Sequence, residues 1–132
     1  MEVEPFLISS SLAVVIGQRL VRKTCPHCQE EVSADDYIKS TFLRAGIEIN
    51  SYIKGKGCSN CFNTGYRGRI GIFEMLEITD SLRSLINKRA SSYDIKEAAR
   101  KEGFRTMFEY GAELVKKGIT TPSEVLSVTK VD

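Results

Sequence analysis

The last third of the chain carries the clearest periodic pattern of hydrophobic and polar positions. From residue 80 onward, apolar side chains recur three and four positions apart, which is the spacing of one face of an α-helix. Capping residues divide this region into four short helices that begin near Asp80, Ser91, Thr106 and Thr121. The inward positions are Leu82, Leu85, Ile86, Ile95, Ala98, Ala99, Met107, Phe108, Gly111, Leu114, Val115, Val125, Leu126 and Val128. The pattern predicts a small C-terminal helical bundle.

Three segments before it also have the pattern of regular elements. Ser33 and Asp36 form a capping box ahead of an amphipathic stretch, which predicts a helix from about residue 34 to 45. Residues 47–54 alternate apolar and polar positions, and residues 69–78 are rich in β-branched and aromatic side chains, so both predict strands. Together these elements indicate an α+β fold that is mainly α.

The N-terminal segment Phe6 to Lys23 has the length of a helix. Its apolar residues lie nearly all round such a helix, so burial on several sides is expected. The start of the chain therefore reads as if the elements that cover this helix had been left behind.

Length, composition and charge exclude several classes of protein. A chain of 132 residues with 42% hydrophobic residues can bury one ordinary core. The net charge of +2 is too balanced to indicate a nucleic-acid or membrane-surface protein. The most apolar stretch, residues 6–16, is shorter than the roughly 20 residues that span a bilayer, and it lacks the flanks of a signal peptide. We therefore expect a cytosolic, reducing environment.

Four cysteines form the strongest chemical pattern. Cys25 and Cys28 make one C-x2-C pair, and Cys58 and Cys61 make another after 29 intervening residues. Two such turns offer the four thiolates of a tetrahedral zinc site, which leaves no open position and so predicts a structural zinc. His27 lies inside the first pair, but with four thiols available we expect it not to be a ligand.

A four-thiolate zinc site carries a formal charge of −2, so nearby cations could moderate it. The alternative for each of them is a solvated side chain on a basic surface. The candidates near the cysteines in sequence are Arg22, Lys23, Lys54, Lys56, Arg67 and Arg69.

Two other interpretations of this region are weaker. A redox dithiol would need a low-pKa cysteine at a helix N-terminus in a thioredoxin-like fold, and neither pair has that context. The glycines at positions 65, 68 and 71 follow a cysteine turn and precede a strand, whereas a phosphate loop lies between a strand and a helix. A turn with positive φ explains them better.

The order of motifs resembles the C-terminal part of the type II secretion and type IV pilus assembly ATPases. The resemblance spans about Val3 to Thr129 and rests on EPFLISSSLAVVIGQRLVRKTCPHC, KGCSNCFNTGYRGRIGIFEMLEI and EGFRTMFEYGAELVKKGITTPSEVLSVT. The chain departs from the family at Gly17, where Ala is usual, and at Phe73, where Tyr is usual. Neither departure involves a cysteine.

The resemblance implies that the intact protein is a hexameric cytoplasmic ATPase, peripheral to the inner membrane through its partners. It implies a terminal helix of the RecA-like core in residues 1–23, a tetracysteine zinc module in 24–78 and a helical domain in 79–132. ATP and Mg would bind only in the intact parent, because the chain contains no Walker A or Walker B motif. The implied partners are the other subunits of the hexamer and an inner-membrane platform protein, and no nucleic acid is expected.

The fragment itself is then expected to be non-catalytic and to serve subunit packing and partner contact, with Arg67 and Arg69 as candidate intersubunit residues. The alternative is a free-standing zinc-ribbon module that binds nucleic acid through these arginines and neighbouring lysines.

Overall fold

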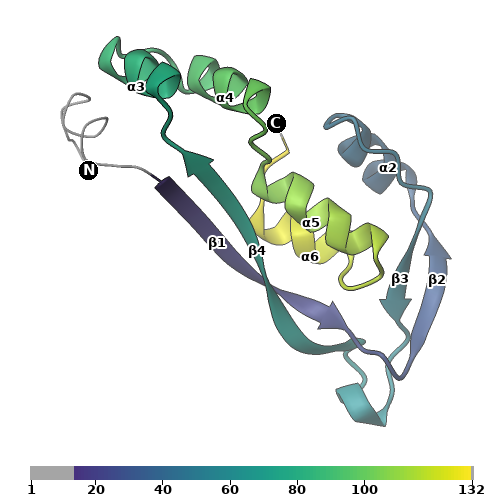
Figure 1. The fold of residues 1–132 in the computed structure, drawn as a ribbon. Helices are drawn as coiled ribbons and strands as arrows, with labels where there is room; N and C mark the ends of the chain where they lie inside the picture. Colours follow the sequence, from purple (N-terminus) through teal and green to yellow (C-terminus); the bar gives the residue numbers. More distant parts are fainter. Residues whose placement is uncertain (1–13, 132) are drawn as a thin grey trace. The chain divides into compact units, whose positions relative to one another are not determined.

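The computed structural model describes residues 14–131, and these form an α+β fold, as the sequence predicts (Figure 1). The strands are β1 (Val14–Thr24), β2 (Gln29–Ser33), β3 (Ser51–Gly55) and β4 (Tyr66–Glu77). The α-helices are α2 (Asp36–Leu43), α3 (Asp80–Asn87), α4 (Ser92–Lys101), α5 (Met107–Lys116) and α6 (Pro122–Val128). A short 3-10 turn, η1, covers Ser59–Cys61. Among the described residues, no helix is long and apolar enough to cross a membrane.

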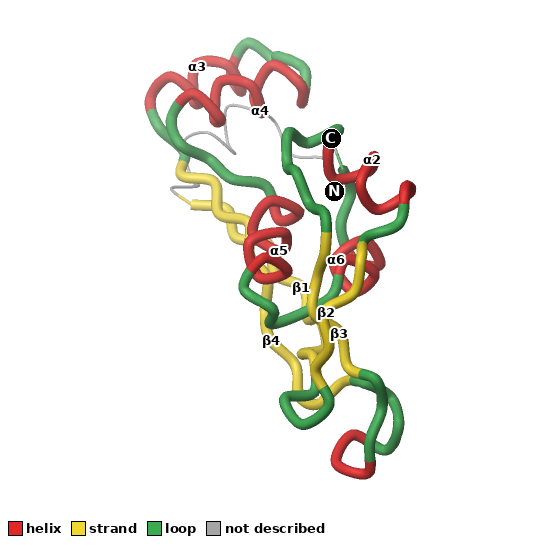
Figure 2. The backbone as a smooth tube through the Cα atoms, turned by 90° about the vertical axis from the view of Figure 1, so that its right-hand side faces the viewer, coloured by secondary structure: helices red, strands yellow, loops and turns green. Residues whose placement is uncertain are grey.

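The strands form two separate two-stranded sheets. β1 pairs with β4, and their arrows run in opposite directions (Figure 1). β2 and β3 pair antiparallel, with Gln29 opposite Gly55 and Ser33 opposite Ser51, and lie side by side in both views (Figure 2). Each two-stranded sheet therefore has a strand end close to a cysteine in sequence.

The predicted N-terminal helix is wrong over its described part. Residues 14–24 form β1, while the part of the predicted helix before residue 14 lies outside the described residues. The β-branched run Val14, Val15 and Ile16 favours an extended backbone, and pairing with the distant strand β4 provides the partner that a local pattern cannot show.

The helix boundaries follow the capping residues closely. Ser91 caps α4 by accepting the N–H of Asp94, and Thr121 caps α6 in the same way from Glu124, as predicted. At α2 the cap is Asp35, whose carboxylate accepts the N–H of Ile38 at 2.8 Å, and not the predicted Ser33. Ser33 belongs to β2, which the sequence did not predict.

The described chain divides into two compact units. Unit 1 contains residues 14–17 and Glu74–Thr106, with helices α3 and α4. Unit 2 contains Gln18–Phe73 and residues 107–131, with α2, α5, α6 and all four cysteines. The four C-terminal helices thus pair as α3 with α4 and α5 with α6, in different units.

The core of unit 2 has two parts. In the first, the rings of Phe42 and Phe108 meet edge to face with centroids 4.8 Å apart. In the second, Val21 of β1 and Ile72 of β4 pack on Leu114 of α5. This second cluster packs β1 and β4 against α5. Cys25 follows the end of β1, and Cys58 and Cys61 precede the start of β4.

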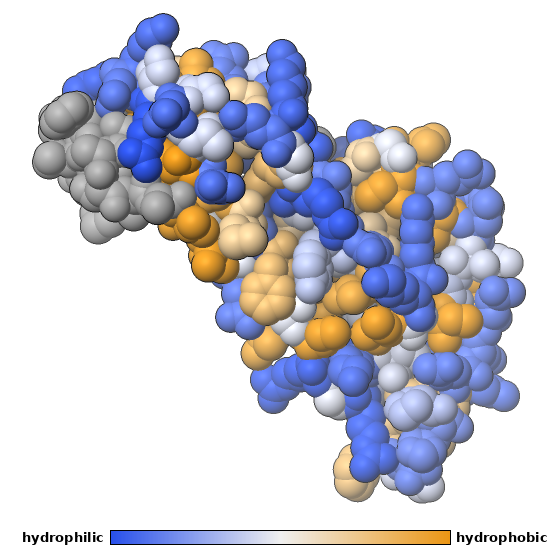
Figure 3. Space-filling view, in the orientation of Figure 1, coloured by the Kyte–Doolittle hydropathy of each residue, from blue (hydrophilic) through white to orange (hydrophobic). Residues whose placement is uncertain are grey.

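Not all apolar side chains are buried. Figure 3 shows apolar residues, in orange, between hydrophilic ones on the visible face. The exposed large apolar side chains of the described chain are Val14, Ile16, Leu20, Tyr37, Leu43, Phe62, Phe73, Met75 and Tyr93.

Candidate metal centre

Two loops of unit 2 carry the cysteines. Cys25 directly follows β1 and Cys28 directly precedes β2, while Cys58 is the N-cap of the 3-10 turn η1 and Cys61 is its last residue. Backbone hydrogen bonds join the loops: the N–H of Cys25 donates to the carbonyl of Gly65 at 2.9 Å, and that of Lys56 to the carbonyl of Cys28 at 2.9 Å. The two loops are therefore held together by main-chain contacts as well as by their sulfurs.

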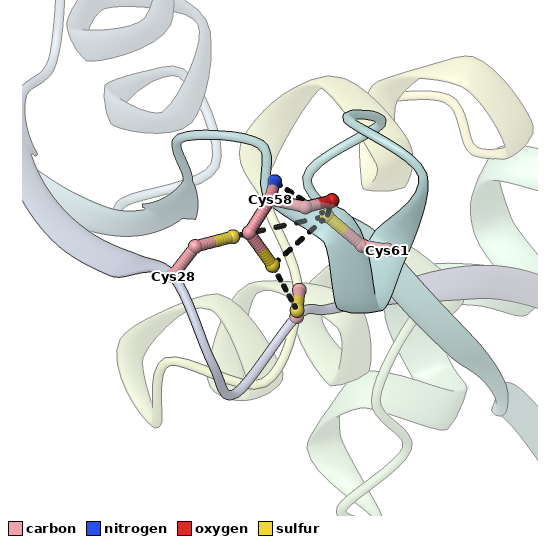
Figure 4. A group of neighbouring side chains, drawn as sticks. Cys28, Cys58 and Cys61 are labelled. Atoms are coloured by element: carbon pink, nitrogen blue, oxygen red, sulfur yellow. Dashed lines mark hydrogen bonds between the residues drawn. The ribbon is translucent and has the colours of Figure 1, made fainter.

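The structure brings all four predicted cysteines into one cluster. Their Sγ atoms all lie within 4.8 Å of one another. The Sγ atoms of Cys25 and Cys58 are 3.8 Å apart, those of Cys28 and Cys61 3.8 Å, and those of Cys58 and Cys61 3.7 Å. Figure 4 shows the sulfurs of Cys28, Cys58 and Cys61 turned toward one another.

These distances fit a tetrahedral metal and not a disulfide. A disulfide holds its sulfurs about 2.05 Å apart, and all four cysteines are free thiols. Four ligands at the usual Zn–S distance of about 2.3 Å stand about 3.8 Å from one another along the edges of the tetrahedron. The four close cysteines could therefore hold a metal ion of the kind that thiolates prefer.

Backbone N–H groups point at the sulfurs, as they do around metal-bound thiolates. Gly57 donates to Sγ of Cys28 at 3.4 Å. Cys58 and Gly65 both donate to Sγ of Cys61 at 3.3 Å. Such donors stabilise negative charge on sulfur and orient it.

Burial and these hydrogen bonds shift the pKa values of Cys28 and Cys61 in opposite directions. Burial raises the pKa of the Cys28 thiol to about 12, against the opposing effect of the Gly57 N–H. Burial also acts to raise the pKa of Cys61, but the N–H groups of Cys58 and Gly65, with the neighbouring thiols, outweigh it and lower that pKa to about 6. The backbone donors thus favour the thiolate form of Cys61.

Gly55 and Gly65, for which the sequence predicts no such role, make the fold of the centre feasible. A Cβ placed on Gly55 would lie 2.2 Å from the carbonyl oxygen of Gly65, and one on Gly65 would lie 2.6 Å from that of Gly55. Gly65 also has a φ of +82°. The only signal in the sequence is the position of both glycines, three residues before Cys58 and four after Cys61.

Among the cations near the cysteines, Arg22 contacts Tyr66 and Glu124. The guanidinium of Arg22 lies 4.1 Å from the centre of the Tyr66 ring and donates to Glu124 at 3.0 Å. In the described chain, the N–H donors found at the sulfurs belong to the backbone, and His27 is not part of the four-sulfur cluster. Lys23 and Arg67 line a separate cavity, taken up below.

Fold and site together define an α+β module organised around a four-cysteine cluster. Comparison with known families identifies the family: a family model described as "Type II/IV secretion system protein" matches residues 1–127. The chain belongs to this family of type II secretion and type IV pilus ATPases.

Curated relatives support the assignment along nearly the whole chain. The type IV pilus assembly ATPase PilB of Thermus thermophilus is 44% identical over 134 residues, covering 98% of this chain and 15% of the relative. The type II secretion system ATPase E of Vibrio cholerae is 40% identical over 130 residues, covering 98% of this chain and 26% of the relative. The chain thus spans about a quarter or less of the length of these relatives.

Proposed function

We propose that this chain is the zinc-stabilised C-terminal portion of a hexameric ATPase that powers type II protein secretion or type IV pilus assembly. In this role the portion is non-catalytic and serves subunit packing and partner contact. The observation that carries the proposal is the set of Sγ distances of 3.7–3.8 Å in a chain that belongs to this family.

Zinc is the metal that fits best. Four thiolates are soft ligands and select zinc over magnesium or calcium. Because Cys25, Cys28, Cys58 and Cys61 would fill a four-coordinate shell, no position remains for water or substrate, and the ion is structural. It stabilises two loops that bury little apolar surface of their own.

The remaining roles belong to the whole protein. ATP and Mg bind in the intact parent, since the nucleotide-binding motifs are absent from these 132 residues. The partners are the other subunits, with Arg67 and Arg69 at the contact, and an inner-membrane platform protein that brings the cytoplasmic enzyme to the membrane. Residues 1–23 would belong to the RecA-like core, 24–78 to the zinc module and 79–132 to the helical domain.

The test is a pair of substitutions in the full-length protein that contains this chain. Cys58→Ser with Cys61→Ser should abolish secretion or piliation and lower ATP hydrolysis, because the cysteine loops no longer hold a metal. Ser59→Ala, in the same turn, should leave both unchanged. Full activity of the double cysteine variant, with its zinc lost, would contradict the proposal.

A further inference from the structure

Unit 2 has an open cavity of about 540 Å³ beside the first cysteine loop. Its walls come from the end of β1, the first cysteine loop, the start of β4 and the turn after α5. Lys23, Arg67 and Lys117 contribute cationic side chains, and no carboxylate is among the described residues that line it. The cavity is therefore strongly positive in a chain whose net charge is only +2.

Two of the three cations make no ion pair with any residue that the structure describes. Lys117 lies 3.3 Å from Glu113, and Arg22, next to Lys23 in sequence, is paired with Glu124 at 3.0 Å. In residues 14–131 no such ion pair is found for Lys23 or Arg67. Lys23 and Arg67, both exposed to solvent, thus place about two positive charges at the cavity that no described residue pairs.

Two glycines form part of the wall of this cavity. Gly68 and Gly118 both line it with positive φ, at +81° and +76°. A Cβ on Gly68 would lie 3.7 Å from Cδ of Lys23, so a side chain at this position would come into van der Waals contact with the lysine stem. A side chain at position 68 would lie against the Lys23 stem, whereas a Cβ on Gly118 would meet Cγ1 of Ile53 at 3.2 Å, and Ile53 is not part of the cavity wall.

We propose that this cavity binds a phosphate monoester. A guanidinium offers the planar fork of donors that phosphate oxygens accept, and ammonium groups add point charges. At pH 7 a phosphate monoester carries a charge of about −1.5 to −2, which balances the two unpaired cations, whereas one carboxylate would balance only one. The cavity is also much larger than the roughly 30 Å³ that a water molecule occupies, so it admits the organic substituent of an ester.

The site goes beyond the proposed function, because neither zinc binding nor ATP hydrolysis requires it. Arg67 is also a proposed subunit-contact residue, so the site is tested in the isolated chain, where no subunit covers it. The phosphate could belong to a soluble metabolite or to a lipid headgroup, since both present the same group.

Titration of the zinc-loaded chain with glycerol phosphate at constant ionic strength tests the site. The amide NMR signals of Gly68 and Gly118 should shift saturably, and neutral glycerol should not shift them. Arg67→Gln and Lys23→Gln should each weaken binding about tenfold or more. Lys39→Gln removes the same charge from α2, outside the cavity, and should leave the affinity unchanged. Retained zinc content shows that each variant is folded at the metal centre.

Vesicles of phosphatidylcholine with and without phosphatidic acid distinguish the two sources. Sedimentation with the phosphatidic acid vesicles alone, lost in Arg67→Gln and kept in Lys39→Gln, assigns the site to a lipid headgroup. Saturable binding of glycerol phosphate without sedimentation assigns it to a soluble ester. The proposal is overturned if neither probe binds, or if Lys39→Gln weakens binding as much as Arg67→Gln, because the effect is then one of overall charge.

Discussion

Gly55 and Gly65 set the closest backbone approach next to the metal centre. A Cβ on Gly55 would lie 2.2 Å from the Gly65 carbonyl oxygen, so Gly55→Ala must push the two segments apart. We expect a loss of about 3 kcal/mol in the free energy of unfolding and weaker zinc binding. Denaturant unfolding and competition with a zinc chelator measure the two effects.

Gly46→Ala is the matched control for that substitution. Gly46 has a φ of +75°, but a Cβ there would have no atom within 4 Å. Only the left-handed backbone then opposes the side chain, at a cost of about 1 kcal/mol, and zinc affinity should not change. Equal zinc affinities for Gly55→Ala and the unmodified chain would show that the glycine contact does not position the centre.

The residues of the centre were only partly predictable. The two C-x2-C pairs predicted the cluster because thiols at that spacing converge whatever lies between them. The contact between Gly55 and Gly65 is made by the backbone alone. The residue types in the sequence therefore do not show which two glycines come together. The N–H donors of Gly57 and Gly65 depend on the loop backbone in the same way.

At the scale of elements, helices α5 and α6 pack through a glycine. A Cβ on Gly111 would lie 2.7 Å from Cγ1 of Val125, which is fully buried. Gly111→Ala should therefore lower the free energy of unfolding by about 2 kcal/mol, although alanine favours a helix. In Gly111→Ala with Val125→Ala the new methyl fills part of the space that valine vacates, so the double variant should lose less than the sum of the two single losses. Strict additivity in a double-mutant cycle would contradict the packing.

The ion pair between β1 and α6 gives a pH dependence of known sign. Burial acts to raise the pKa of Glu124, but the hydrogen bonds and charge of Arg22 outweigh it and hold that pKa below its ordinary value of 4.5. A carboxylate with a depressed folded-state pKa stabilises the fold above its unfolded-state pKa, and the contribution is lost as pH falls through the folded-state value.

Glu124→Gln isolates this contribution. Because Arg22 is half exposed, we expect a loss of only about 1 kcal/mol at pH 7. The difference in stability between the two chains should shrink as pH falls below 4.5, since protonated Glu124 no longer pairs. Comparing the chains at each pH cancels the loss of metal in acid. A difference that does not vary with pH would refute the ion pair.

The elements show where local patterns suffice. Ser91 and Thr121 were predictable as caps because their hydrogen bonds span three residues. Strand β1 was not predictable in this way, because an apolar segment of that length is compatible with a helix as well as with a strand. Only its pairing with β4 distinguishes the two. β2 has the sequence QEEVS, which has little β propensity, and it is extended because β3 pairs with it.

At the scale of the whole molecule, the α+β class and the family followed from the sequence, whereas the grouping of helices did not. Helical periodicity identifies the inward face of α3, α4, α5 and α6 but not the element that each face meets. The division of these helices between two compact units depends on contacts between segments far apart in the chain.

The metal content of the purified chain tests the central claim most directly. X-ray absorption at the zinc edge, combined with elemental analysis, should find about one zinc per chain with four sulfur neighbours at about 2.3 Å. Chelation should then unfold the cysteine loops, because the metal holds them. A chain that folds without metal, or a zinc shell that contains nitrogen or oxygen in place of a cysteine sulfur, would contradict the account.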